Sequence, residues 1–94
     1  MTSTATPTHI SSVVVHCKPE LMKTVANLAN TIEQLEVRAS DAGGKLVALL
    51  ETKNEQEILS IISQLETING VLTATLVYHE IDYDDEHMDE SYNA

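Results

Sequence analysis

Few side chains in this sequence could do chemistry. Two histidines, His16 and His79, and the single cysteine, Cys17, lie in apolar segments, and no second thiol is available to pair with Cys17. Two histidines alone fall short of a zinc site, which needs at least a third ligand. A lone cysteine in an apolar segment is usually a small core residue. These residues predict no catalytic centre, no metal site and no cofactor.

The acidic residues are concentrated at one end of the chain. The 94 residues include 15 Asp and Glu against five Lys and Arg, a formal net charge of −10. Seven of the acids lie between residues 80 and 94, which contain no Lys or Arg, so residues 1–79 have a net charge of only −3. Such a chain gains nothing from release of phosphate counterions, which argues against nucleic acid and anionic membranes as partners. A cationic partner is favoured instead.

The two ends of the chain indicate a cytoplasmic protein with one folded domain. Residues 1–8 (MTSTATPT) lack the basic and apolar regions of a secretory signal, and no run of apolar residues is long enough to insert into or cross a membrane. With one cysteine, no internal disulfide can form. We expect a disordered arm at residues 1–8, a binding domain at residues 9–80 and a disordered acidic tail at residues 81–94.

Four segments have the composition of β-strands. They are rich in Val, Ile, Leu and Thr, which suit a pleated and half-buried surface. One of them alternates apolar and polar residues and should have one solvated face, whereas the others are more apolar. The four predicted strands are residues 10–17, 35–40, 45–52 and 71–80.

Two amphipathic helices are predicted between these strands. The first begins at Pro19, which is tolerated at the first helical position. The second has Asn54 and Glu57 at the spacing of a capping box and ends at Gly70. Their apolar faces consist of Leu21, Val25, Leu28, Ala29 and Ile32 in the first helix, and of Ile58, Ile61, Ile62 and Leu65 in the second.

The order strand, helix, strand, strand, helix, strand predicts an α+β ferredoxin-like sandwich. In this fold a four-stranded antiparallel sheet has two helices on one face. Residues 41–44, with two glycines, supply the turn between the two central strands of the sequence. No further segment is left to cover the second face of the sheet, so we expect that face to be open.

Alternation along each strand assigns its side chains to the two faces. The residues expected to point towards the helices are Val13, Val15, Cys17, Leu35, Val37, Ala39, Leu46, Ala48, Leu50, Leu72, Ala74, Leu76 and Tyr78. The candidate binding residues expected on or beside the other face are Ser12, Val14, His16, Val47, Leu49, Glu51, Thr73, Thr75, Val77, His79 and Glu80.

The valines and leucine of this second set form an apolar patch with hydroxyl, imidazole and carboxylate groups around it. Such a patch often marks a partner site on a soluble protein. Two alternatives stay open: these are ordinary strand residues, or the patch closes in a homodimer. His16 and His79, expected side by side, could hydrogen-bond to a partner at the rim.

One part of the sequence carries a more specific signal. Residues 70–80 (GVLTATLVYHE), with residues 10–15 (ISSVVV) and Ser40-Asp41 before the glycine turn, resemble the NapD family, and the resemblance extends from about His9 to Glu80. It implies a ferredoxin-like cytoplasmic chaperone. It also implies binding of the twin-arginine signal peptide of the periplasmic nitrate reductase catalytic subunit, which restrains export until the molybdenum cofactor is inserted and the enzyme has folded.

The peptide implied by this resemblance has an apolar stretch beside two arginines. An apolar sheet face suits the stretch, and carboxylates suit the arginines through charge-assisted pairing. Glu51 and Glu80 are the candidate partners of the arginines. The peptide could lie on the face as a helix or add a strand to the sheet edge. We expect the helix, because the face is apolar whereas the second strand, an expected edge, carries charges.

Three other functions are compatible with the predicted fold. A small-ligand-binding regulatory module is the main alternative, but such modules usually accompany a catalytic or DNA-binding domain. An acylphosphatase-like hydrolase needs cationic groups around a phosphate, and this chain has only five Lys and Arg. A metal-carrying domain needs two nearby cysteines. The sequence therefore predicts a binding protein that is not an enzyme.

Overall fold

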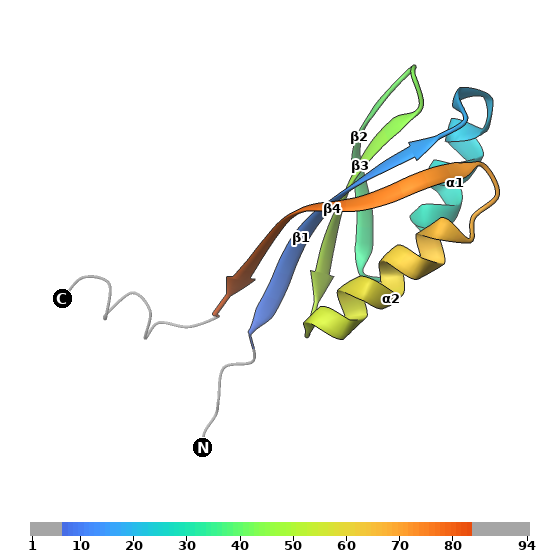
Figure 1. Ribbon diagram of the computed structural model, residues 1–94. Coiled ribbons are helices and arrows are strands. Elements are labelled where there is room, and N and C mark those ends of the chain that lie inside the picture. Colours follow the sequence, from blue (N-terminus) through green and yellow to red (C-terminus); the bar gives the residue numbers. More distant parts are fainter. Residues whose placement is uncertain (1–6, 84–94) are drawn as a thin grey trace.

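The computed structural model describes residues 7–83, so the predictions for residues 1–6 and 84–94 lie outside the described residues. The predicted elements follow in the predicted order, with a short 3-10 helix before the first α-helix (Figure 1). They are β1 (Thr8–Cys17), the 3-10 helix (Pro19–Leu21), α1 (Met22–Ala29), β2 (Leu35–Asp41), β3 (Lys45–Thr52), α2 (Glu55–Glu66) and β4 (Val71–Asp82). The first and last strands, β1 and β4, are longer than predicted. β1 begins at Thr8 and β4 continues past Glu80, because the two strands pair as far as Thr8 and Asp82.

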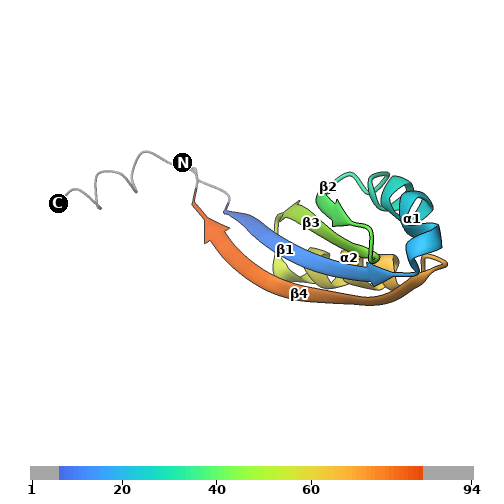
Figure 2. The same cartoon turned by 90° about the horizontal axis from the view of Figure 1, so that it is seen from above.

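The four strands form one antiparallel sheet in the order β2-β3-β1-β4. Buried residues of α1 and α2 belong to the same apolar cluster as the inward residues of β1 and β3, so both helices cover one face. β1 and β4 lie side by side along their whole length and curve together (Figures 1 and 2). The predicted α+β ferredoxin-like sandwich is confirmed.

The core between the sheet and the helices is aliphatic. The inward positions predicted for β1 and β3 are confirmed, and their side chains are buried. Leu28 was expected to join them but is 47% exposed, because the face of α1 that packs on the core is centred on the buried Val25 and Ala29, one helical turn apart, with Met22 and Ala26 partly buried beside them. The core residues are Val13, Val15, Cys17, Val25, Ala29, Leu35, Leu46, Ala48, Leu50, Ile58, Ile61 and Leu65.

The start of α2 has the predicted capping arrangement. The Asn54 side chain accepts a hydrogen bond from the backbone N–H of Glu57 at 2.9 Å. The Glu57 carboxylate in turn accepts from the N–H of Lys53 at 3.0 Å, one residue before the cap. Two backbone donors at the helix start are thereby satisfied, and the direction in which α2 leaves β3 is fixed.

Two glycine turns anchor the end of β1. Gly44 and Gly70 have φ angles of 100° and 102°, which L side chains rarely adopt. The carbonyl of Gly44 accepts from the N–H of Cys17 at 2.8 Å, and the carbonyl of Gly70 accepts from the N–H of Lys18 at 2.9 Å. Both turns therefore pack against the point at which β1 ends.

A bulge in β2 changes one predicted face. Val37 pairs with Ala48 and Ala39 with Val47, so Arg38 has no partner on β3. An extra residue of this kind reverses the alternation of side chains beyond it. Ala39 is therefore exposed beside Val47, and its predicted inward position is wrong.

Two irregularities in β4 have the same effect. Leu72 and Val77 are the extra residues, lying between paired positions on β1. Leu72 was expected in the core but is 62% exposed. Beyond Val77 the faces are exchanged: Tyr78 pairs with Ser12 of the open face, and His79 pairs with Ser11, which is buried on the helix side. The predicted positions of Tyr78 and His79 are therefore both wrong.

Candidate functional site

The pairing of β1 with its two neighbours arranges twelve side chains in four rows on the uncovered side of the sheet. These twelve side chains are called the open face. They include nine of the eleven candidate binding residues, all except Val77 and His79. Written in the order β3, β1, β4, the rows are Glu51–Ile10–Glu80, Leu49–Ser12–Tyr78, Val47–Val14–Thr75 and Lys45–His16–Thr73.

The two middle rows provide an apolar surface. Val14, Val47 and Leu49 are adjacent across β1 and β3 and are half-buried by their neighbours. Ile10 extends this surface towards the acidic row and was missed, although alternation from Ser12 and Val14 would have found it. No side chain of the two middle rows is charged, so this part of the face can contact an apolar segment without burying a charge.

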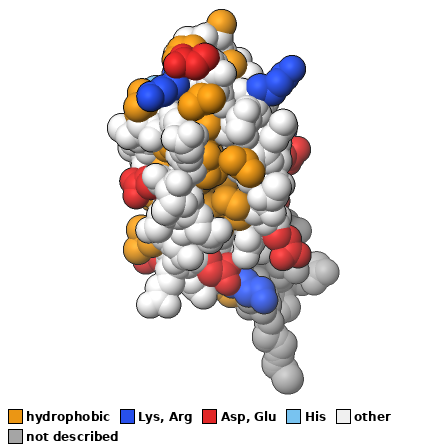
Figure 3. Space-filling model, turned by 90° about the vertical axis from the view of Figure 1, so that its right-hand side faces the viewer, with side chains coloured by type: hydrophobic (Ala, Val, Ile, Leu, Met, Phe, Trp, Pro, Cys, Tyr) orange, Lys and Arg blue, Asp and Glu red, His pale blue; other side chains and the backbone are white. Residues whose placement is uncertain are grey.

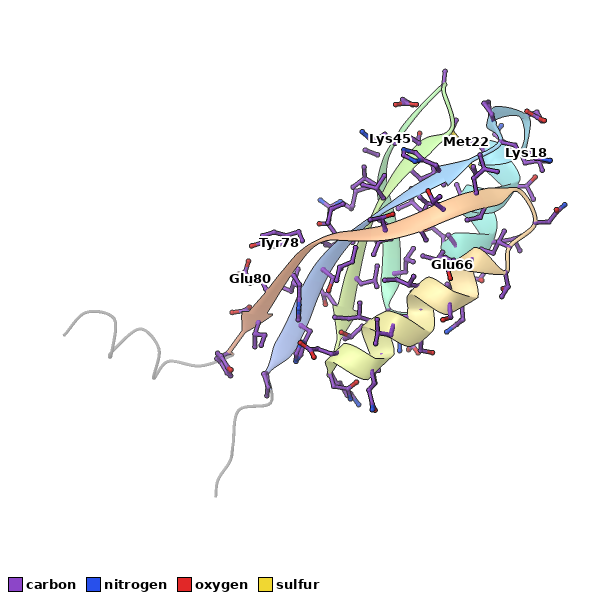
Figure 4. The ribbon with its side chains drawn as sticks, viewed as in Figure 1. Lys18, Met22, Lys45, Glu66, Tyr78 and Glu80 are labelled. Carbon is purple, nitrogen blue, oxygen red and sulfur yellow. The ribbon has the colours of Figure 1, made fainter. Side chains whose placement is uncertain are left out.

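Two carboxylates lie at one end of the open face. Glu51 and Glu80 flank Ile10 from opposite sides, and both are exposed. The Tyr78 hydroxyl donates a hydrogen bond to the Glu80 carboxylate, and this bond, with the negative charge of Glu80, raises the pKa of Tyr78. In Figure 4, Tyr78 and Glu80 point away from α2, on the side of the sheet that the helices leave uncovered. The bond orients Glu80 at the edge of the apolar surface.

The opposite end of the open face has a different charge. Lys45 and His16 are exposed neighbours there, and the Nδ1 atom of His16 lies 3.4 Å from the Thr73 hydroxyl. Asp41 is paired with Lys45 in the register of β2, but its Oδ1 atom accepts hydrogen bonds from the N–H groups of Gly43 at 2.9 Å and Lys45 at 3.4 Å. The backbone of the turn therefore donates hydrogen bonds to one oxygen of the carboxylate at this end.

His79 lies on the helix side and not beside His16. Its Nε2 atom shares a hydrogen bond of 2.8 Å with Nδ1 of His9, and the two rings stack with centroids 5.0 Å apart. Its Nδ1 atom lies 4.0 Å from a carboxylate oxygen of Glu55 at the start of α2. The predicted pairing of His16 with His79 is wrong because the strand register places His16 opposite Thr73 and His79 opposite Ser11, five positions away along β1. The bulge at Val77 also turns His79 to the helix side. Its partner His9 was not predicted, since the expected strand began one residue later.

The two histidines and Glu55 do not form a metal site. They lie in series, with His79 using one ring nitrogen towards His9 and the other towards Glu55. Ligands of one ion must converge on a single point. Within residues 7–83, no three His, Cys, Asp or Glu side chains gather in a way that could hold a metal.

Cys17 is a core residue, as predicted. Its thiol donates to the carbonyl of Gly44 at 3.4 Å, and burial raises its pKa. Because the thiolate is the reactive form, this raised pKa makes the thiol a poor nucleophile.

A hollow of about 490 Å³ adjoins the acidic end of the open face and was not predicted. It lies where β2 begins and α2 starts, and Leu49 and Glu51 belong both to it and to the open face. Its lining has one cationic residue, Lys53, and the carboxylates of Glu33, Glu36, Glu51 and Glu57. This end of the molecule therefore carries more negative charge than Glu51 and Glu80 alone would give it.

Apolar side chains are not confined to the open face. Figure 3 shows a group of them on the side of the molecule that lies at the right in Figure 1, with charged side chains around it. On the helices, Leu28 and Leu59 are exposed by 47% and 62%. These helix positions provide a reference against which binding to the open face can be tested.

The fold and the open face together define a small ferredoxin-like protein with one sheet face available to a partner. None of the helices within residues 7–83 is long and apolar enough to cross a membrane.

Comparison with known proteins identifies the family. The model of the family described as NapD protein matches residues 8–83. Chaperone NapD of Escherichia coli K12 is 31% identical over 72 residues, covering 76% of this chain and 83% of that protein. Chaperone NapD of Haemophilus influenzae is 27% identical over 75 residues, covering 79% of this chain and 81% of that protein. The chain belongs to the NapD family, as the sequence resemblance indicated.

A solved structure agrees with this assignment. The solution structure of the E. coli Tat proofreading chaperone protein NapD superimposes with a TM-score of 0.72 and 29% sequence identity, covering 84% of this chain and 81% of that one. These relatives are named chaperones and not enzymes, and the homology supports a chaperone role for this chain.

Proposed function

We propose that this chain is a cytoplasmic chaperone that binds the twin-arginine signal peptide of the catalytic subunit of periplasmic nitrate reductase. The peptide occupies the open face and is thereby withheld from export until the molybdenum cofactor has been inserted and the enzyme has folded. In this proposal the chain catalyses no reaction. Its only action is to cover the export signal.

The observation that carries this proposal is the composition of the open face. Val14, Val47 and Leu49 form an apolar group in its uncharged middle rows, beside two hydroxyl side chains and Tyr78. Two exposed carboxylates, Glu51 and Glu80, flank Ile10 in the next row. An apolar peptide segment gains free energy by covering such a surface. Arginines beside that segment can pair with the carboxylates through charge-assisted hydrogen bonds.

We propose that the peptide binds as a helix and not as an added strand. Both edge strands are irregular: β2 has a bulge at Arg38, and β4 has extra residues at Leu72 and Val77. A strand added to either edge would meet an interrupted row of backbone hydrogen-bonding groups. A helix on the open face satisfies its own backbone and needs only the side chains of the face.

Titration with a synthetic twin-arginine signal peptide tests the proposal. Backbone NMR shifts should be saturable and should cluster at Val14, Val47, Leu49, Thr75 and Tyr78. Absence of saturable binding, or shifts confined to α1 and α2, would show that the open face is not the site. Sedimentation of the free protein as a stable dimer that buries this face would favour closure of the patch in a homodimer.

A charge placed in the middle of the open face should weaken binding strongly. Val14→Asp buries an unpaired carboxylate under the apolar segment of the peptide, so affinity should fall by about 2–3 kcal/mol, or roughly 30- to 150-fold, in isothermal titration calorimetry. The matched control is Leu59→Asp, which adds the same charge at an exposed apolar position of α2 and should leave affinity unchanged. Equal losses in both variants would argue against this site.

The restraint on export can be followed in cells. With Val14→Asp in place of the natural chain, nitrate reductase lacking its molybdenum cofactor should reach the periplasm prematurely. With Leu59→Asp, export should wait for cofactor insertion as usual. Unchanged export in the Val14→Asp cells, despite lost peptide binding, would separate peptide binding from export control.

A further inference from the structure

The open face is electrically asymmetric along the direction of its strands. The row at the start of β1 has two exposed carboxylates, Glu51 and Glu80, and borders the hollow with further acidic residues. The row at the end of β1 has Lys45 and His16 and no acidic residue within it. A partner with charge at only one end will distinguish these two rows.

The nearby charges reduce this asymmetry without reversing it. Arg38 lies 3.6 Å from Glu36, and both are exposed, so one carboxylate near the acidic end is partly compensated. Lys53 is the cation in the lining of the hollow, against four glutamates. At the other end, Asp41 is paired with Lys45 in the register of β2 and offsets its charge, which leaves that end close to neutral. The acidic end therefore remains the more negative one.

The length of the open face suits a helical signal peptide. Ile10 and His16 are six residues apart on β1, a distance of about 20 Å at the rise of an antiparallel strand. A helix of roughly 13 residues has the same length. This matches the 7–15 residues of a typical apolar signal segment. One such segment can therefore extend from the acidic row to the row of Lys45.

Two independent properties of the peptide select its direction. In a signal peptide the cationic residues precede the apolar segment, so they lie at the N-terminal end of the bound helix. The helix dipole places a partial positive charge at that same end and a partial negative charge at the C-terminal end. Both effects favour the N-terminal end beside Glu51 and Glu80, and the C-terminal end beside Lys45 and His16.

We propose, on the basis of the function proposed above, that the signal-peptide helix lies on the open face parallel to β1. Its arginines lie at the row of Ile10, and its apolar segment runs across Val14 and Val47 towards His16. The hollow beside Glu51 leaves room for one of the long arginine side chains. An apolar surface alone would permit the helix to lie parallel or antiparallel to β1. The charged ends of the face select the parallel orientation.

Paramagnetic labelling of the peptide measures this direction. A nitroxide label is attached to the synthetic signal peptide either just before the arginines or just after the apolar segment, and the amide signals of the isotope-labelled full-length protein are recorded. The first label should broaden the amides of Ile10, Glu51 and Glu80, and the second those of Lys45 and Thr73. The reverse pattern, or equal broadening at both ends with both labels, would overturn the proposed orientation.

The charges can be tested separately from the label. Glu51→Gln combined with Glu80→Gln should weaken binding by about tenfold, and this loss should disappear for a peptide in which both arginines are glutamines. The matched variant Lys45→Gln should weaken binding only slightly and equally for both peptides. Tighter binding in Lys45→Gln, with no effect of the glutamate changes, would place the arginines beside Lys45 and overturn the proposed orientation.

These experiments distinguish failure of the orientation from failure of the proposed function. Peptide binding on the open face in the reversed direction would leave the chaperone proposal intact and overturn only the orientation. No saturable binding to the wild-type protein would overturn the proposed function itself, and the orientation with it.

Discussion

Ser11 and Thr52 each have a buried hydroxyl oxygen without a hydrogen-bond partner among the residues that the structure describes. They are neighbours of the histidine pair: Thr52 is paired with His9 across β1 and β3, and Ser11 with His79 across β1 and β4. An otherwise aliphatic core therefore has one polar corner at its end. An unpaired buried hydroxyl has a desolvation cost without a compensating bond.

Replacing the Thr52 hydroxyl by a methyl group should stabilise the protein. Thr52→Val keeps the shape of the side chain and removes the unpaired oxygen, so the free energy of unfolding should rise by about 1 kcal/mol. Urea unfolding followed by circular dichroism measures this change. Thr24→Val on the exposed side of α1 is the control and should stay within about 0.5 kcal/mol of wild type. Destabilisation by Thr52→Val would mean that water satisfies the hydroxyl in solution.

At the scale of elements, turns and bulges determine which side chains reach the open face. The glycine turns fix where β1 ends, and the bulge at Val77 brings Tyr78 onto the face and removes His79 from it. A shift of one residue in a strand exchanges its two faces. The composition of the candidate site is therefore sensitive to a few backbone positions outside it.

The turn between β2 and β3 provides a matched pair of glycines. A Cβ atom at Gly44 would collide with the backbone carbonyl of Cys17, and the positive φ of this residue adds strain. A Cβ atom at Gly43 would lie 3.3 Å from a carboxylate oxygen of Asp41, which is a flexible side chain, and its φ is not positive. The two positions differ in backbone constraint, although they are adjacent.

Gly44→Ala should therefore destabilise the protein by about 2–3 kcal/mol. Gly43→Ala should change the free energy of unfolding by less than about 1 kcal/mol. Chemical denaturation of both variants gives the comparison. Equal effects would show that the turn can relax and that it does not hold the end of β1.

At the scale of the whole molecule, net charge should influence the rate of encounter with a cationic peptide more than the stability of the complex. The chain has a net charge of −10, and five acidic residues follow residue 83. Long-range attraction accelerates association and is screened by salt, with a Debye length of about 30 Å at 0.01 M and about 8 Å at 0.15 M.

Neutralising these five acids in the full-length chain should slow peptide association several-fold at low salt and leave it unchanged at physiological salt. The dissociation rate should not change, because the contacts on the open face are intact. Stopped-flow fluorescence of a labelled peptide measures both rates. An identical salt dependence in the variant would show that these charges do not steer the peptide. The changed residues are Asp84, Asp85, Glu86, Asp89 and Glu90.

Local sequence patterns predicted the order of the elements, the ferredoxin-like fold and the faces of β1 and β3. These features depend on interactions within one element, such as the alternation of Val13, Val14 and Val15 or the cap formed by Asn54. Eight of the candidate binding residues could be placed on one face in this way, because their strand segments keep a regular period. Glu80 was expected only beside this face, and the extra residue at Val77 brings it onto the face. The family resemblance was also contained in these local segments.

The tertiary structure alone decided the positions of Ala39, Tyr78 and His79, the hydrogen bond between His9 and His79, and the acidic hollow. A bulge forms only when a strand is fitted to its neighbour, and residues 70 positions apart meet only through that pairing. The sequence by itself determined that a sheet face would be open and apolar in the middle. Which charges lie at each end of that face follows from strand register, because register depends on contacts distant in sequence.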